Sequence, residues 1–111
     1  MTVEVQRNGN VFVVRLAGEL SKEACGQLHK TISSTLSEDR AAIVLDMSQI
    51  GFIDSKGLEL LLWTRDTCRV SSVQFRLVGL GEHCRKILEV TRLAQEFHCA
   101  DKLSEAIQTL V

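Results

Sequence analysis

The chain has 111 residues, of which 45% are apolar and 24% charged, and its 13 basic and 14 acidic side chains leave a formal charge of -1. This length and composition predict one globular domain over residues 1–111. The balanced charge argues against a broad electrostatic surface for nucleic acid or anionic lipid. The sequence lacks an apolar run of the ~20 residues that span a membrane, and its start does not resemble a secretory signal. We therefore expect a cytoplasmic protein that binds neither nucleic acid nor membrane.

The first half of the chain predicts a hairpin, a helix and a buried strand. Apolar and polar residues alternate over residues 2–7, and a richer β-branched run follows over 11–16, with an Asn-Gly turn between them. Ser21 is predicted to cap an amphipathic helix that ends near Ser37. The continuous apolar run 41–45 is typical of a central strand that is covered on both faces.

The second half predicts three helices, a strand and a short extended piece. They are a helix from near Ser55 to about Arg69, a strand over 73–78, a short helix over 82–89, an extended piece over 94–99, and a last helix capped by Asp101 whose buried face is Leu103, Ala106, Ile107 and Leu110. The order ββαβαβαα implies an α/β fold with right-handed crossovers. We expect a mixed, mostly parallel sheet of four to five strands, an N-terminal hairpin and about four helices.

The cysteines and histidines do not predict a metal site. The four cysteines, at positions 25, 68, 84 and 99, have no CxxC spacing, so reduced thiols are expected rather than a disulfide framework. Cys25 with His29, His83 with Cys84, and His98 with Cys99 would supply zinc ligands only if the pairs met in space. Adjacent side chains on a helix or strand point in different directions. Buried thiols and exposed histidines are therefore favoured, with no metal and no other cofactor.

Two catalytic motifs are each matched only in part, and their missing residues argue against an enzyme. Gly79-Leu80-Gly81 precedes a predicted helix, but Cys84 stands where a dinucleotide site needs its third glycine, so a plain turn is favoured. Ser55-Lys56-Gly57 matches only the second half of the hydrolase motif GxSxG, because Ile53 replaces the first glycine. None of the three histidines has a spacing that places it beside Ser55 as a base.

The segment around Ser55 carries the most information about function. Ser55 stands where a strand is followed by a helix, and this edge of an open α/β sheet is where functional groups are exposed. Asp54 is predicted to cap the helix, and Gly57 removes a side chain beside Ser55, so that a docking protein could approach the backbone. The alternative is that Ser55 is merely part of an Asp-Ser helix start.

The run from Asp46 to Leu58, DMSQIGFIDSKGL, closely resembles the signature of STAS domains, particularly the bacterial anti-sigma-factor antagonists. Weaker matches occur in the correct order at residues 16–20, 77–80, 88–97 and 105–106, so the resemblance covers nearly the whole chain. It implies a single STAS domain that works as a switch in protein binding rather than as an enzyme.

In this family the serine that matches Ser55 is phosphorylated by an anti-sigma factor that is itself a serine kinase. The resemblance implies that the unphosphorylated protein binds this kinase and frees a sigma factor, that phosphorylation releases the kinase, and that a serine phosphatase restores binding. The sequence departs from the family at Ser21, where aspartate is common, and at Arg92, where glycine is frequent. The alternative is a STAS scaffold or subunit of a stress-signalling or lipid-transport complex.

Five residues are expected to contact the partner: Glu19, Ser21, Lys56, Leu60 and Trp63. With about 100° per residue and the other leucines of the helix facing the core, Leu60 and Trp63 are predicted to point outward. Tryptophan is enriched among the residues that dominate binding energy. The alternative is a tryptophan that lies under a neighbouring helix or loop, and self-association of the chain is left open.

Overall fold

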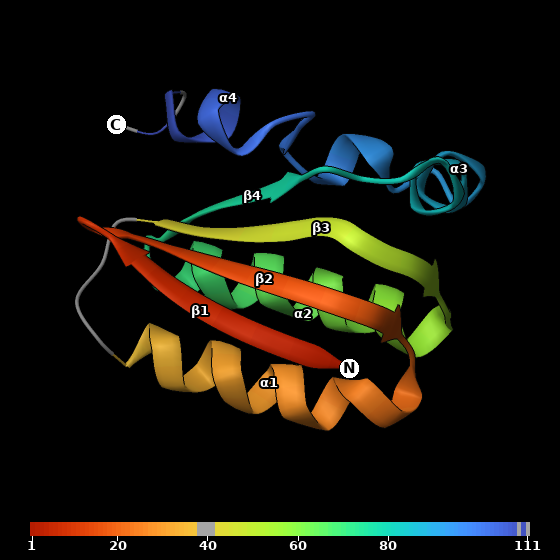
Figure 1. Ribbon diagram of the computed structural model, residues 1–111, viewed down its shortest axis with the longest axis horizontal. Coiled ribbons are helices and arrows are strands. Elements are labelled where there is room, and N and C mark those ends of the chain that lie inside the picture. The colour runs from red at the N-terminus through yellow and green to blue at the C-terminus, as the bar shows by residue number, and fades with distance from the viewer. Residues whose placement is uncertain (38–41, 109, 111) are drawn as a thin grey trace.

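The computed structural model describes residues 1–37, 42–108 and 110, which form a five-stranded sheet in the order β1-β2-β3-β4-β5. β1 runs antiparallel to β2, and the other neighbouring strands are parallel. The strands are β1 (Thr2–Asn8), β2 (Val11–Leu20), β3 (Ala42–Ile53), β4 (Gln74–Val78) and β5 (Cys99–Ala100) (Figure 1). The predicted mixed, mostly parallel sheet with an N-terminal hairpin is confirmed.

In the part of the chain that the structure describes, four α-helices and one short 3-10 helix connect and follow the strands. They are α1 (Lys22–Leu36), α2 (Ser55–Val70), α3 (Glu82–Val90), the 3-10 helix η1 (Ala94–Glu96) and α4 (Leu103–Gln108). α1 and α2 lie together on one side of the sheet, and α4 lies across the sheet from them (Figure 1). The prediction of an extended piece over 94–99 is wrong in its first half, because residues 94–96 form η1. Only residues 99 and 100 pair with β4.

β3 is the central strand, and its side chains supply both cores. Ile43 and Leu45 belong to the main core beneath α1 and α2. Val44, which points to the opposite face because strand side chains alternate, packs with Val78 and with Ala106 of α4. The predicted strand covered on both faces is confirmed, although residue 41 lies outside the described residues. Leu103 and Leu110 also pack on this second core, as predicted for the last helix.

β2 and β3 extend well beyond the predicted residues 16 and 45. Their parallel pairing continues to Leu20 opposite Ile53, across register shifts between Arg15 and Ala17 and between Gly18 and Glu19. Such bulges break the regular alternation on which a sequence prediction depends. Because the two strands end side by side, the helices that follow them, α1 and α2, also begin side by side.

Two helix ends differ from the sequence pattern. α4 begins at Leu103, and the carboxylate of Asp101, which was predicted to cap it, instead pairs with the Arg85 guanidinium at 3.2 Å. α3 ends at Val90, and two residues later Arg92 has a φ of 61°. The backbone N–H of Arg92 donates to the Glu89 carbonyl, and that of Leu93 donates to the Leu88 carbonyl. This Schellman arrangement favours glycine at the left-handed position, which arginine occupies in this chain.

Candidate functional site

Asp54 joins the starts of two helices. Its Oδ1 accepts a hydrogen bond of 2.9 Å from the backbone N–H of Gly57, in the first turn of α2. Its Oδ2 accepts one of 3.0 Å from the backbone N–H of Lys22, the first residue of α1. The bond from Gly57, followed by the bond from Lys22, holds the pKa of this carboxyl below its ordinary value. The predicted cap on α2 is confirmed, and the same ionised carboxylate also binds α1.

The sequence predicted that Ser21 caps α1. Ser21 does occupy the position before α1, but its side chain makes no capping hydrogen bond. Its hydroxyl donates instead to the Glu23 carboxylate at 3.0 Å. The acceptor for the first N–H of α1 comes from Asp54, at the end of the neighbouring strand. Local sequence does not reveal a cap that is 32 residues away. The contact exists because β2 and β3 end together.

Ser55 is the first residue of α2, and its side chain is exposed. Within the residues that the structure describes, its hydroxyl has no hydrogen-bond partner. The next residue, Lys56, is also exposed, and its Nζ lies 3.2 Å from the Glu59 carboxylate. The Ser55 hydroxyl is therefore open to solvent beside the positive end of the α2 dipole, where added negative charge is favoured.

Gly57 does not provide the open approach that the sequence suggested. The residue is buried, and a Cβ at this position would collide with the carbonyl oxygen of Leu20 and lie 2.8 Å from the Ile53 side chain. The missing side chain lets the first turn of α2 lie against the end of β2. Its role is thus to position Ser55 from within the fold, not to make room for a partner.

The residues predicted to contact a partner fall into two groups: Glu19, Ser21 and Lys56 form the first, and Leu60 and Trp63 form the second. Glu19 lies at the end of β2, directly opposite Phe52 of β3, and is exposed like Lys56. Glu19, Ser21, Ser55 and Lys56 therefore share the carboxyl edge of the sheet. The sequence prediction missed Phe52, which is 42% exposed although Ile50 and Ile53 on either side of it are buried.

The prediction that Leu60 points outward is wrong. Leu60 is only 6% exposed and belongs to the main core, whereas Trp63 is half-buried and packs against the edge of that core. α2 is covered by the sheet and also by α1, so its buried arc is wider than one leucine stripe. The Trp63 ring stacks on His29 of α1, with centroids 3.9 Å apart and an interplanar angle of 21°.

A groove of about 370 Å³ separates the exposed sides of α1 and α2. Its lining is mostly apolar surface, from Lys22, Cys25, Gly26, His29, Lys56, Glu59, Leu60 and Trp63. The Cys25 thiol donates to the Ser21 carbonyl at 3.2 Å, and burial, with the negative charge of Asp54, raises its pKa. The thiol is thus protonated at neutral pH, which disfavours a nucleophilic or metal-binding role.

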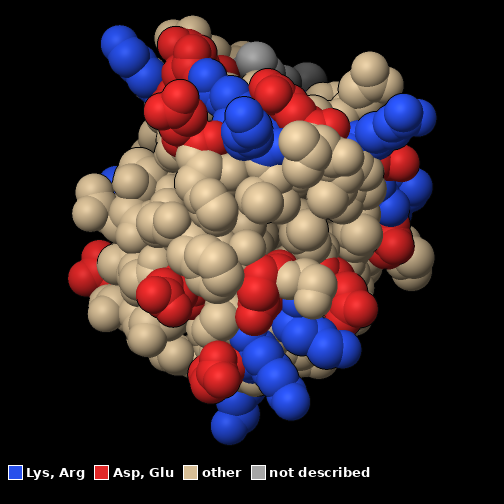
Figure 2. Space-filling view, turned by 90° about the vertical axis from the view of Figure 1, so that its right-hand side faces the viewer, with Lys and Arg blue, Asp and Glu red and all other residues tan. Residues whose placement is uncertain are grey.

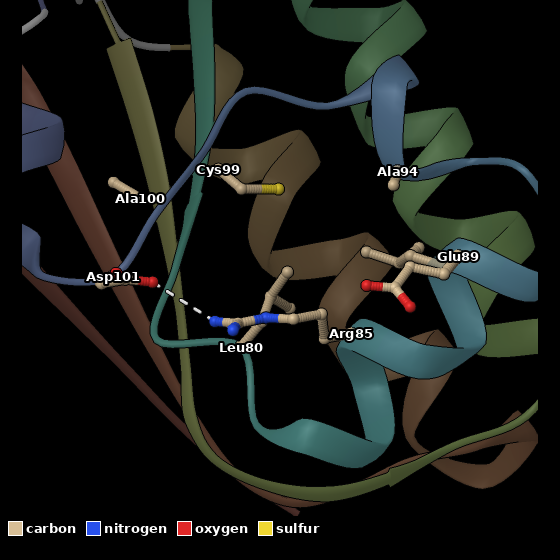
Figure 3. Close-up of a pocket in the computed structure, with 8 residues that line it drawn as sticks. Leu80, Arg85, Glu89, Ala94, Cys99, Ala100 and Asp101 are labelled. Carbon is tan, nitrogen blue, oxygen red and sulfur yellow. Dashed lines mark hydrogen bonds and ion pairs between the residues drawn. The ribbon is translucent and has the colours of Figure 1, made fainter.

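A second hollow, of about 230 Å³, lies between α3 and β5, away from Ser55. Figure 3 shows the Cys99 sulfur on its wall and the Arg85 guanidinium reaching toward Asp101. All four cysteines are free thiols. Over residues 1–37, 42–108 and 110 there is no cluster of three His, Cys, Asp or Glu side chains arranged to hold a metal. In the same residues, no helix has the length and apolarity needed to cross a membrane.

Comparisons with known proteins place these features in one family. The STAS domain family model matches residues 2–106. The chain is 27% identical to the anti-sigma-F factor antagonist RsfB of Mycobacterium tuberculosis, over 96% of this chain and 87% of that protein. An anti-sigma factor antagonist from Mycobacterium paratuberculosis has a similar structure, with a TM-score of 0.88, 26% identity, and 98% and 92% of the two chains covered. The phosphorylated form of Bacillus SpoIIAA shares the fold at a TM-score of 0.75 and 23% identity, covering 96% and 97%.

Proposed function

The chain belongs to the STAS domain family, and from this premise we propose that it is an anti-sigma-factor antagonist that is switched by phosphorylation of Ser55. In its unphosphorylated form it binds an anti-sigma factor serine kinase, which then releases a sigma factor. Transfer of phosphate to Ser55 releases the kinase, and a serine phosphatase restores binding. The protein is thus a regulated binding module and not an enzyme.

The observation that carries this proposal is the open Ser55 hydroxyl at the start of α2. The side chain is exposed and has no partner in the part of the chain that the structure describes. The Asp54 cap and the close approach allowed by Gly57 hold its backbone against two strand ends. A hydroxyl on such a rigid support is available to the active site of a kinase without local unfolding.

The charge of a phosphate explains how the switch changes binding while preserving the fold. Phosphate adds about -1.5 to -2 charges at neutral pH. At an exposed helix start this charge is favoured by roughly 0.3 to 1 kcal/mol. Inside an interface the phosphate would lose water beside the ionised Asp54, and an unpaired buried charge costs several kcal/mol. Because each 1.4 kcal/mol changes affinity tenfold, one phosphate is sufficient to release the partner.

The proposed contact surface includes Glu19, Ser21, Lys56 and Trp63. The first three lie with Ser55 at the carboxyl edge of the sheet, and Lys56 and Trp63 also line the groove between α1 and α2. Leu60 forms the floor of that groove and contributes mainly to the core. The surface thus combines a polar rim at Ser55 with an apolar groove beside it, an arrangement typical of protein interfaces.

The positions of the histidines support a binding role. His29 stacks on Trp63 and His83 stacks on Phe52, and neither ring makes a hydrogen bond to the Ser55 hydroxyl in the described residues. A serine nucleophile needs a base within hydrogen-bond reach. The described residues supply no such histidine contact at Ser55, which favours Ser55 as an acceptor of phosphate from another enzyme.

The test combines phosphorylation with binding. The full chain is incubated with its anti-sigma factor kinase and ATP, and the modified residue is identified by mass spectrometry. Binding of the kinase is then measured by calorimetry for Ser55→Ala and Ser55→Glu, with Ser33→Glu on the exposed side of α1 as the charge-matched control. We expect phosphate on Ser55 only, binding by Ser55→Ala and Ser33→Glu, and loss of binding by Ser55→Glu.

Two outcomes contradict the proposal. Phosphate on another residue removes Ser55 as the switch. Unchanged binding by Ser55→Glu, with a native circular dichroism spectrum, indicates a STAS domain that does not switch, such as a scaffold or the subunit of a larger complex.

A further inference from the structure

A second exposed surface lies next to Ser55 and contains no charged side chain. It is formed by the end of β3 and the start of α3, and we call it the Phe52 face; its residues are Ser48, Gln49, Gly51, Phe52, Gly81 and His83, all exposed. Figure 2, which looks onto this edge of the molecule, shows a broad uncharged field bordered by acidic and basic side chains. An uncharged centre with a charged border is the pattern of a protein interface.

Phe52 is the apolar centre of this face. It is 42% exposed, and only three other large hydrophobic side chains in the described residues are comparably exposed: Val5, Val70 and Val90. The Phe52 ring stacks on His83 with centroids 5.6 Å apart and an interplanar angle of 20°. The stack fixes the ring between β3 and α3, so little conformational entropy would be lost when a partner covers its free side.

Two glycines lie on this face, and Gly81 is also the N-cap residue of α3. Neither Gly51 nor Gly81 has a positive φ, and Gly81 has a φ of -71°. A Cβ at Gly51 would meet no atom within 4 Å, and one at Gly81 would have its nearest neighbour at 3.9 Å. Neither backbone conformation nor internal packing therefore requires glycine at these positions. Their absent side chains leave the surface beside Phe52 flat, so that the backbone of another protein can approach it closely.

The Phe52 face is continuous with the proposed switch. Phe52 lies directly opposite Glu19 in the sheet and three residues before Ser55. A protein that contacts both Glu19 and Ser55 must therefore also approach Phe52. Glu19 and Glu82, at the border of the uncharged field, are both exposed acids. These two acids favour basic side chains opposite them in a partner, around an apolar centre.

From these observations we infer that the Phe52 face is the apolar anchor for the same anti-sigma factor kinase that contacts Ser55. The kinase would cover the Phe52–His83 stack with an uncharged, apolar segment and place basic residues against Glu19 and Glu82. The inference rests on the proposed function, and it extends the interface from the start of α2 to the start of α3.

The experiment measures the affinity of unphosphorylated variants for that purified kinase by calorimetry. Phe52→Ser removes the anchor, and Gly51→Gln adds uncharged bulk to the flat surface. Val90→Ser, which removes an exposed side chain from the far end of α3, is the matched control. We expect Phe52→Ser and Gly51→Gln each to weaken binding at least about tenfold, the size of effect shown by central interface residues. Val90→Ser should bind within about twofold of the unchanged protein.

The outcomes separate this inference from the proposed function. If Ser55→Glu abolishes binding while folded Phe52→Ser and Gly51→Gln bind normally, the switch stands and the Phe52 anchor is refuted. If Ser55→Glu also binds normally, the proposed switch fails. Circular dichroism and melting curves confirm that each variant is folded, and Gly51→Gln reports on the surface even if Phe52→Ser proves unstable.

Discussion

The carboxylate of Asp54 lies 3.0 Å from the backbone nitrogen of Lys22, although the two residues are 32 positions apart in the chain. Because the same carboxylate caps α2 through Gly57, one side chain holds the starts of α1 and α2 together. Both helices line the groove beside Ser55. The geometry of the candidate site therefore depends on one ionised carboxylate.

The first prediction concerns Asp54→Ala. The change leaves two helix N–H groups without their acceptor, and a single N-cap already stabilises a protein measurably. We expect the melting temperature to fall by roughly 5 to 10 °C in a domain of this size. Asp46→Ala is the comparison, because the Asp46 carboxylate also accepts a backbone N–H but does not lie at the start of a helix. Equal melting temperatures for Asp54→Ala and the unchanged protein would show that the double cap does not stabilise the fold.

Acid should weaken the fold through the same residue. Because the hydrogen bonds from Gly57 and Lys22 lower the pKa of Asp54 in the folded protein, its ionised form is favoured there relative to the unfolded chain. This stabilisation is fully present above the unfolded pKa of about 3.9 and is lost as the pH falls through the lower folded pKa. Urea unfolding between about pH 6 and pH 2 should show that the free energy of unfolding falls less with acid in Asp54→Asn than in the unchanged protein. An Asp54 pKa at or above the ordinary value for aspartate, measured by NMR titration of its carboxyl group, would contradict the prediction.

Gly57 and Gly26 should respond in opposite directions to the same substitution. Gly57→Ala forces a Cβ against the Leu20 carbonyl oxygen, and overpacking of this kind costs about 1 to 3 kcal/mol. A Cβ at Gly26, inside α1, would meet no atom within 4 Å, so Gly26→Ala should stabilise the helix by about 0.5 to 1 kcal/mol. Chemical unfolding of both variants provides the measurement. A stabilised Gly57→Ala would show that α2 does not need its close approach to β2.

The Trp63–His29 stack can be followed by fluorescence because the chain has one tryptophan. His29→Ala removes the ring that covers Trp63 and should shift its emission to longer wavelength. Trp63→Ala should weaken binding of the anti-sigma factor while the far-ultraviolet circular dichroism spectrum is kept, because Trp63 borders the groove beside Lys56. Unchanged binding would remove Trp63 from the contact surface, and unchanged emission in His29→Ala would mean that the stack does not shield the ring.

Arg92→Gly should stabilise the protein. Arg92 follows the end of α3 in the left-handed conformation, at a φ of 61°, which costs a residue with a side chain about 1 to 2 kcal/mol. Glycine removes that cost but gains freedom in the unfolded chain, so the net gain should be about 1 kcal/mol or less. Arg85→Gly, inside the same helix, should instead destabilise the fold. A loss of stability in Arg92→Gly would contradict the assignment of strain to this turn.

The hairpin, the central strand and both long helices were predictable from the sequence because each depends on local patterns. Alternation over residues 2–7, the apolar run before Asp46 and the leucine spacing after Ser55 each specify an element without reference to distant residues. The position of Ser55 at a strand-to-helix junction followed from the same patterns. The resemblance of residues 46–58 to STAS domains identified the family, which the match over residues 2–106 then confirmed.

Tertiary structure alone decided what surrounds Ser55. Asp54 reaches α1 only because β2 and β3 are paired to their ends, and Gly57 is buried only because that pairing brings Leu20 beneath it. Leu60 faces the core because a second helix covers α2, which a single helical stripe does not reveal. Local sequence determines which elements form, because helix and strand periodicity act over a few residues. The contacts at the site join residues far apart in the chain, so they are set by strand register and helix packing.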